Sequence, residues 1–116
     1  MKKRALVVGG AGIRGGKILT ELLREGYIVY SLDDGPSKVS AGRVVNLFCG
    51  KRNENVLREM LHSHRFDCVI DAASRTRDDA EMIYRLLDKS CLRQYRYLNP
   101  HRFRRGVGRQ PEPLTE

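Results

Sequence analysis

The sequence predicts an α/β fold built on an incomplete doubly wound parallel sheet, and three observations lead to this prediction. Short β-branched runs alternate with helix-period segments along the first 88 residues, which is the pattern of successive βαβ units. The first apolar run, residues 5–8, contains no polar residue, as expected of a central parallel strand buried on both faces. A βαβ unit takes about 30 residues and a full doubly wound sheet has about six strands. A chain of 116 residues therefore holds about four or five strands of such a sheet.

The first βαβ unit is expected between residues 5 and 32. After the strand at residues 5–8 and a glycine cluster, apolar residues recur at helical spacing, and Gly26 ends the predicted helix. These apolar residues are Ile18, Leu19, Leu22 and Leu23. Residues 27–30 are β-branched or aromatic, so residues 27–32 are predicted to form the second strand. Residues 33–37 have the composition of a loop.

Two helices and three strands are expected after that loop. Strands are predicted at residues 43–49, 66–73 and 95–98, and Pro100 prevents the last of them from continuing. The helix after residue 53 has Asn53 or Asn55 as its expected N-cap, and the helix after residue 76 has Thr76 or Asp78. The apolar stripes of the two helices are Val56, Leu57, Met60 and Leu61, and Ala80, Ile83, Leu86 and Leu87.

The charge of the chain is unevenly distributed. The sequence has 22 Lys and Arg against 14 Asp and Glu, a formal net charge of +8. Residues 1–88 hold 15 basic and 12 acidic side chains, whereas residues 89–116 hold 7 basic and 2 acidic ones. We therefore expect a folded domain over residues 1–98 and a basic tail rich in Arg, Gly and Pro over residues 99–116.

Composition also restricts the class of protein. A hydrophobic fraction of 41% is too high for a disordered segment. No apolar run approaches the ~20 residues that span a bilayer, and the apolar run at residues 5–8 is shorter than the core of a signal peptide. The sequence therefore predicts a cytoplasmic protein without a membrane segment. Cys49, Cys68 and Cys91 are expected to be buried free thiols, and His62 and His64 to lie at a helix end, with no metal site.

A glycine motif lies between the first strand and the first helix. Gly9, Gly12 and Gly15 have the spacing G-x-x-G-x-x-G, which lets a backbone turn sharply and lets a pyrophosphate approach the helix N-terminus. Asp33 follows Gly15 by 18 positions, close to the ~20 expected of the acid that binds the adenosine ribose. Its carboxylate would repel a 2′-phosphate and so favours NAD over NADP, although Arg14 offers a cation to a phosphate. The alternative is a glycine-rich turn without a ligand and a solvated Asp33.

Three segments resemble the NAD-dependent epimerase/dehydratase family, the extended short-chain dehydrogenases that act largely on nucleotide sugars. They are residues 8–15 (Val-Gly-Gly-Ala-Gly-Ile-Arg-Gly), 32–34 (Leu-Asp-Asp) and 67–73 (Asp-Cys-Val-Ile-Asp-Ala-Ala), and the resemblance extends roughly over residues 4–98. It implies a Rossmann-type domain of oxidoreductases and isomerases. It also implies a cofactor site in which the glycine loop, with Ile13 and Arg14, holds the pyrophosphate, Asp33 holds the ribose, and Ala72 and Ala73 let the sheet edge approach NAD.

The chain also departs from the pattern of this family. Lys51 and Arg52 follow Gly50, where the family commonly has an aspartate that contacts adenine. No tyrosine is followed four positions later by the lysine that lowers the pKa of the catalytic tyrosine in the family. No catalytic residue is therefore assigned, and we expect cofactor binding without turnover by this chain alone. A gene fragment, a frameshift near residue 90 and a minimal nucleotide-binding module all remain open.

Two other functions remain open, and the alternative for the arginine-rich segment is a solvated or disordered tail without a ligand. The arginines at residues 93–109 alternate with Tyr95, Tyr97 and Phe103, a combination that neutralises phosphates and stacks on single-stranded RNA bases. A degenerate dehydrogenase fold that senses NAD or binds a partner is the other alternative. Sheet edges left open by missing strands would favour self-association. In full-length members of the resembled family, the partner is a nucleotide sugar.

Overall fold

The computed structural model describes residues 2–35, 43–49, 54–74 and 76–98, and it contains every predicted strand and helix. In chain order the elements are β1 (Arg4–Val8), α1 (Ile13–Arg24), β2 (Ile28–Asp33), β3 (Val44–Phe48), α2 (Glu54–His62), β4 (Cys68–Asp71), α3 (Arg77–Leu86) and β5 (Gln94–Tyr97). The α/β prediction is therefore confirmed.

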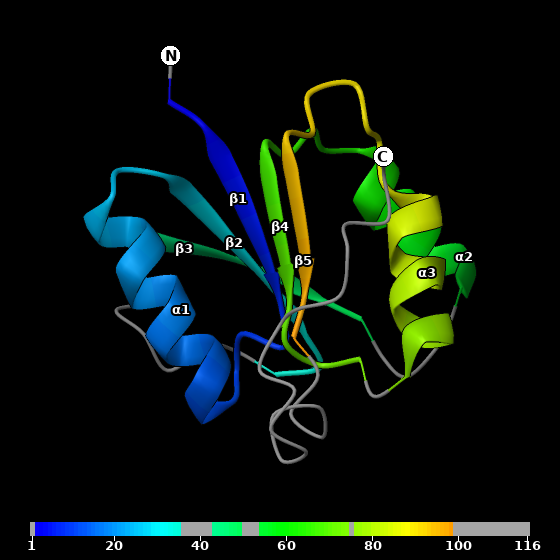
Figure 1. Ribbon diagram of the computed structural model, residues 1–116, viewed down its shortest axis with the longest axis horizontal. Coiled ribbons are helices and arrows are strands. Elements are labelled where there is room, and N and C mark those ends of the chain that lie inside the picture. The colour runs from blue at the N-terminus through cyan, green and yellow to red at the C-terminus, as the bar shows by residue number, and fades with distance from the viewer. Residues whose placement is uncertain (1, 36–42, 50–53, 75, 99–116) are drawn as a thin grey trace.

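The five strands form one parallel sheet in the order β3-β2-β1-β4-β5 (Figure 1). The chain moves outward from β1 through β2 to β3, and it then returns to the other side of β1 for β4 and β5. This order confirms the doubly wound prediction and corresponds to the first five strands of a Rossmann sheet. The order reverses between β1 and β4, where the carboxyl ends of parallel strands leave a crevice.

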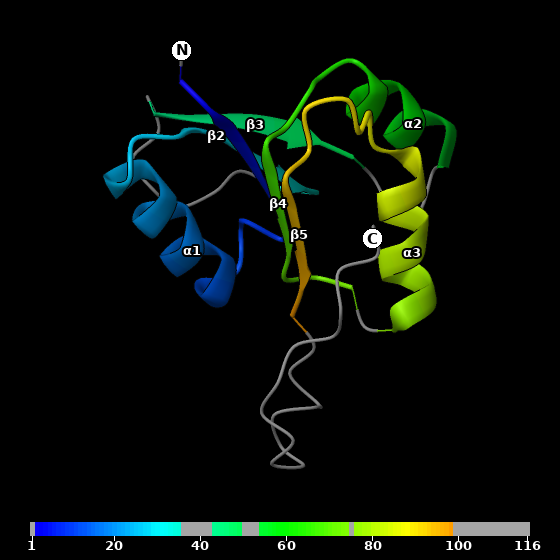
Figure 2. The same cartoon turned by 45° about the horizontal axis from the view of Figure 1, so that its top comes forward.

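The helices cover the sheet on both faces, with α1 on one face and α2 and α3 on the other (Figures 1 and 2). Alternate residues of β1 accordingly enter different cores. Leu6 and Val8 belong to the core under α2 and α3, whereas Ala5 and Val7 belong to the core under α1. All of these side chains are buried, which explains why the strand is apolar at consecutive positions.

The helix ends agree in part with the sequence signals. Gly26 has a positive φ of 93° just beyond α1, so the predicted stop is confirmed. Thr76 is the N-cap of α3, since its hydroxyl oxygen accepts a hydrogen bond from the Asp79 N–H at 3.1 Å, and Asp78 lies in the first helical turn instead. Asn55 is inside α2 and was wrong as an N-cap, while Asn53 lies outside the described residues.

The fourth strand, β4, is shorter than the predicted range of residues 66–73, and it ends at Asp71. The Asp71 carboxylate accepts hydrogen bonds from the backbone N–H groups of Ala73 and Ser74 at 3.0 and 2.9 Å. These bonds turn the chain away from the sheet. Ala72 and Ala73 therefore lie in a turn at the carboxyl end of β4 rather than in the strand.

The histidines act at a helix end, as expected. The Nδ1 atom of His64 lies 2.9 Å from the Met60 carbonyl oxygen near the end of α2, and His62 Nδ1 lies 3.0 Å from the Leu86 carbonyl oxygen. No group of three His, Cys, Asp or Glu that could hold a metal ion occurs within the described ranges.

The expectation of buried thiols is only partly correct. Cys68 is buried in β4 and Cys49 is half-buried, but Cys91 is exposed. Cys91 lies in the irregular connection between α3 and β5, where it takes no part in either hydrophobic core. All three cysteines are free thiols.

The two edges of the sheet are formed by β3 and β5. On β3, the side chains of Val45 and Phe48 are 44% and 51% exposed, so this edge presents apolar surface. Self-association through the edges stays a prediction. None of the described helices has the length and apolar character needed to cross a bilayer. The expected tail, residues 99–116, lies outside the described residues.

Candidate functional site

The glycine motif forms the connection between β1 and α1. Gly9 has a positive φ of 93°, a conformation that disfavours residues with a Cβ, and its N–H donates to the Leu32 carbonyl oxygen at 2.8 Å. Gly12 is the N-cap of α1 and is exposed, and no side chain caps this helix end. The first turn of α1 also contains no acidic residue. The helix N-terminus can therefore receive an anion.

Gly15 is required for close packing of the helix against the loop. A Cβ at Gly15 would overlap the Gly9 carbonyl oxygen and would lie 2.9 Å from the Cα atom of Gly10. Gly12 differs, because a Cβ there would have only the Gly9 carbonyl oxygen in reach, at 3.8 Å. Gly15 thus shapes the loop, whereas Gly12 leaves open space on its outer side.

Gly10 is a structural residue that the sequence analysis did not include among the site residues. A Cβ at Gly10 would overlap the Ser31 side chain, whose hydroxyl is buried without a hydrogen-bond partner among the described residues. The signal was present in the sequence, since Gly10, Gly12 and Gly15 themselves have the spacing G-x-G-x-x-G. Gly10 lets the loop lie directly on β2.

Asp33 connects the end of β2 to this loop. Its Oδ2 atom accepts a hydrogen bond from the Ala11 N–H at 3.0 Å, and its Oδ1 atom accepts one from the Asp34 N–H at 2.8 Å. Because Asp33 is only half-buried, the remaining lone pairs of the carboxylate stay within reach of a ligand's hydroxyl groups. The structure therefore brings the predicted acid to the predicted glycine loop.

Ile13 and Arg14 occupy the first turn of α1, beside the exposed Gly12. The Ile13 side chain is 82% exposed, and Arg14 is half-buried. Both residues are thus at the helix end where the sequence analysis placed a phosphate. Lys51 and Arg52, at the expected adenine contact, lie outside the described residues.

Ala72 and Ala73 meet the glycine loop from the other side. The Ala72 N–H donates to the Val8 carbonyl oxygen at 2.9 Å, and a Cβ on Gly9 would lie 2.9 Å from the Cβ of Ala73. The two small side chains therefore adjoin the loop at the β1/β4 reversal. All eight predicted site residues lie along this one edge of the sheet.

Asp71 is a second residue that the sequence analysis did not single out. Its side chain is fully buried, and its Oδ2 atom accepts hydrogen bonds from the Ser74 hydroxyl at 2.5 Å and the Tyr95 hydroxyl at 3.3 Å. Burial raises the pKa of the Asp71 carboxyl, and the hydrogen bonds from Ser74, Ala73 and Tyr95 oppose that shift. An aspartate inside an apolar strand was the available signal.

The Tyr95 phenol is poorly suited to act as a base for proton abstraction. The Tyr95 phenol is 2% exposed and lies 3.1 Å from the Ala80 carbonyl oxygen. Burial and the neighbouring Asp71 carboxyl raise its pKa, which disfavours the phenolate.

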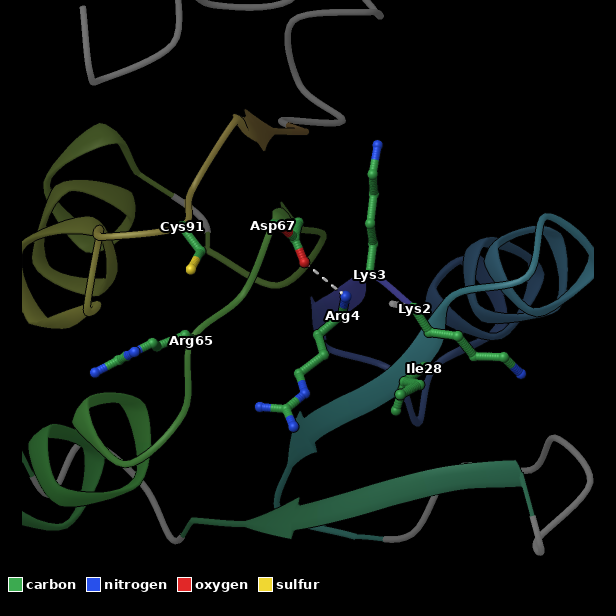
Figure 3. Close-up of a pocket in the computed structure, with 7 residues that line it drawn as sticks. All are labelled: Lys2, Lys3, Arg4, Ile28, Arg65, Asp67 and Cys91. Atoms are coloured by element: carbon green, nitrogen blue, oxygen red, sulfur yellow. Dashed lines mark hydrogen bonds between the residues drawn. The ribbon is translucent and has the colours of Figure 1, made fainter.

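A separate hollow of about 490 Å³ opens at the opposite edge of the sheet, beside the amino ends of β1 and β2 (Figure 3). Four cationic residues line it, namely Lys2, Lys3, Arg4 and Arg65. Asp67 is the anionic member, and its Oδ2 atom accepts a hydrogen bond from the Arg4 N–H at 2.8 Å. Figure 3 shows that the cationic groups spread outward rather than converge on one point. The hollow is basic, but it has no single focus for an anion.

A family model described as "NAD dependent epimerase/dehydratase family" matches residues 5–89. This range includes all eight predicted site residues and excludes the tail. A search of curated proteins found no match.

Solved structures share the fold. The UDP-glucose 4-epimerase of Thermotoga maritima, solved with UDP-glucose, has a TM-score of 0.64 and 19% identity, with 81% of this chain and 37% of that chain covered. The UDP-glucose 4-epimerase of Bifidobacterium longum, in complex with NAD+ and UDP, has a TM-score of 0.63 and 21% identity, with 81% and 36% covered. The Bordetella bronchiseptica enzyme WbmH, in complex with NAD+, has a TM-score of 0.59 and 14% identity, with 74% and 35% covered. The present chain spans little more than a third of the length of these neighbours.

Proposed function

We propose that this chain, which belongs to the NAD dependent epimerase/dehydratase family, binds NAD at the carboxyl edge of its sheet. The observation that carries the proposal is the bond between the Asp33 carboxylate and the Ala11 N–H, at 3.0 Å. This bond holds a carboxylate that can accept hydrogen bonds from ribose hydroxyls. The carboxylate lies beside a glycine loop and a helix N-terminus that no side chain caps. These are the groups that a dinucleotide requires, in the arrangement that it requires.

The residues present fit this cofactor. Open space beside Gly12 lets a pyrophosphate approach the first N–H groups of α1, and no carboxylate in the first turn repels it. Asp33 accepts hydrogen bonds from the adenosine ribose and disfavours the 2′-phosphate of NADP. Ala72 and Ala73 leave room on the β4 side, where the nicotinamide half would lie.

The proposed activity is binding rather than turnover. When bound, NAD supplies a hydride acceptor at its nicotinamide ring. The chain would hold and orient that group, but it has no Tyr-x-x-x-Lys pair to take a proton from a sugar hydroxyl. A nucleotide sugar is the proposed partner of the whole family enzyme, on the analogy of the UDP-glucose epimerases that share the fold.

Calorimetric titration of the 116-residue protein with NAD and NADP tests the proposal. We expect NAD to bind at least about tenfold more tightly than NADP, because Asp33 opposes an added phosphate. Affinity should change little with salt. No binding of NAD, or equal binding of both dinucleotides, would contradict the assignment of the site.

A second candidate function, RNA binding, is favoured by the basic hollow at the opposite edge. Lys2, Lys3 and Arg4 line it, and Arg93 and Arg96 are exposed just before β5 and within it. The side chains of Tyr95 and Tyr97 are buried, so they are not available to stack on RNA bases as the sequence analysis expected. Binding of a single-stranded RNA there would weaken steeply between low and moderate salt. Replacing Lys2, Lys3 and Arg4 by Gln should reduce it and leave NAD affinity unchanged. An RNA affinity that is insensitive to salt would exclude this function.

A further inference from the structure

Asp71 joins three elements behind the candidate site. It ends β4, its carboxylate reaches the Tyr95 hydroxyl of β5, and that hydroxyl also lies 3.1 Å from the Ala80 carbonyl oxygen in α3. The Asp71 side chain is fully buried and Tyr95 is 2% exposed. The carboxyl group is therefore held in one place by rigid neighbours.

The same carboxyl shapes the turn at residues 71–74. Its Oδ1 atom accepts hydrogen bonds from the N–H groups of Ala73 and Ser74, and its Oδ2 atom accepts one from the Ser74 hydroxyl. Three of the four hydrogen bonds that it accepts thus come from the two residues at the tip of the turn. Without this acceptor, the two N–H groups would lose the partner that sets the course of the turn.

The turn is in direct contact with the glycine loop. The position of a Cβ on Gly9 would be 2.9 Å from the Ala73 Cβ and 3.2 Å from the Ala73 nitrogen. Ala73 thus lies against the glycine loop, in the space that a side chain on Gly9 would occupy. The carboxyl of Asp71 therefore holds in place the turn that adjoins the glycine loop at the β1/β4 reversal.

The two sides of β1 would face different halves of a bound dinucleotide. Asp33 and β2 lie on one side of β1, where the adenosine ribose would bind, and the turn at residues 71–74 lies on the other side. A dinucleotide crosses the reversal with one mononucleotide half on each side. The turn consequently faces the nicotinamide half and not the adenosine half.

We propose that Asp71 is a positioning residue for the nicotinamide half of the dinucleotide site, acting through the backbone of Ala73 and Ser74. The proposal rests on the proposed binding of NAD, and it assigns to Asp71 a role for one half of that ligand only. Asp71 itself does not touch the cofactor, because its side chain is fully buried.

The role requires a hydrogen-bond acceptor rather than a negative charge. Among the described residues, the titratable group that bonds to Asp71 is the Tyr95 phenol, with Tyr97 beside it on β5, and no Lys, Arg or His is paired with the carboxyl. Burial without a cation raises the pKa of the Asp71 carboxyl. An asparagine keeps the Oδ1 acceptor for both N–H groups, and its amide donates to the Ser74 and Tyr95 oxygens.

The test compares affinities for NAD and for ADP, which carries only the adenosine half and the pyrophosphate, by calorimetry. Asp71→Leu should lower NAD affinity at least about tenfold and change ADP affinity by less than about twofold. Asp71→Asn should retain NAD affinity within about threefold of the wild type. Asp67→Leu is the matched control, because it removes a carboxylate that also accepts a backbone N–H but lies at the amino end of β4, and it should leave both affinities unchanged.

If circular dichroism shows that Asp71→Leu does not fold, Ser74→Ala serves as the second variant for the same test. This half-buried residue loses only its bond to Oδ2, and NAD affinity should fall several-fold with ADP affinity unchanged. Equal losses for NAD and ADP in the folded variants, or no loss for NAD, would overturn the role of Asp71. A wild-type protein that binds ADP but not NAD would overturn the proposed function itself.

Discussion

The Oδ2 atom of Asp33 accepts a hydrogen bond from the backbone N–H of Ala11 at 3.0 Å. Residues 22 positions apart are thereby joined, one at the end of β2 and one in the glycine loop. The bond fixes the loop relative to the acid that would hold the ribose. The proposed cofactor site would thus be organised before a ligand binds, which lowers the entropic cost of binding.

Replacing Asp33 by Asn should weaken NAD binding by about 10- to 100-fold, since hydrogen bonds to a charged group contribute about 1.5–3 kcal/mol. The asparagine retains an acceptor for the Ala11 N–H, so the fold should remain. Asp34→Asn, one position further along and exposed, is the matched control. Titration with NAD measures both variants, and equal affinities in the two would argue against a ribose contact by Asp33.

Two glycine variants should separate folding from binding. Gly15→Ala places a methyl group on the Gly9 carbonyl oxygen and should destabilise the fold by about 1–3 kcal/mol in urea unfolding. Gly12→Ala has space for the methyl group and should change stability by less than about 0.5 kcal/mol. It should nevertheless lower NAD affinity, because the methyl group would enter the space proposed for the pyrophosphate. An unchanged affinity in Gly12→Ala would place the pyrophosphate elsewhere.

The pH dependence of stability should reveal the buried carboxyl of Asp71. Burial raises its pKa above the ordinary value of 3.8, so the fold favours the protonated form. The stability that the protonated Asp71 carboxyl contributes to the fold is fully present below pH 3.8. It is lost as the pH rises through the raised pKa of the folded state. Asp71→Asn is neutral throughout, and the stability of the wild type relative to this variant should fall from about pH 4 toward neutrality. Urea unfolding over this range checks the sign, and a constant difference would contradict it.

The three thiols should react with a disulfide reagent at distinct rates. Cys91 is exposed and should react first, whereas burial raises the pKa of Cys68 to about 11 and should protect it until the protein unfolds. Cys49 is half-buried, its pKa is raised by burial, and it should react at an intermediate rate. Spectrophotometric thiol titration follows these phases. Cys91→Ser should remove the fast phase alone, and its persistence would show that another thiol is accessible.

The sequence by itself determined the order of strands and helices, the doubly wound fold and the residues of the glycine loop. It could do so because these features depend on local signals: apolar runs, helical stripes, and glycines where the backbone must turn. It also placed Asp33 at the end of the second strand beside the glycine loop, because the distance along the chain from the loop to that strand end is set by one helix and one strand.

Only the tertiary structure decided which distant residues meet. Gly10 is needed because Ser31 of the neighbouring strand lies against it, and a spacing count along the chain cannot show that contact. Asp71 reads in the sequence as a polar residue near a strand end, yet its bonds to Ser74 and Tyr95 make it the buried centre of a turn. Hydrogen bonds between elements arise when the strands pair, so their partners are fixed by the sheet register and not by the order of residues.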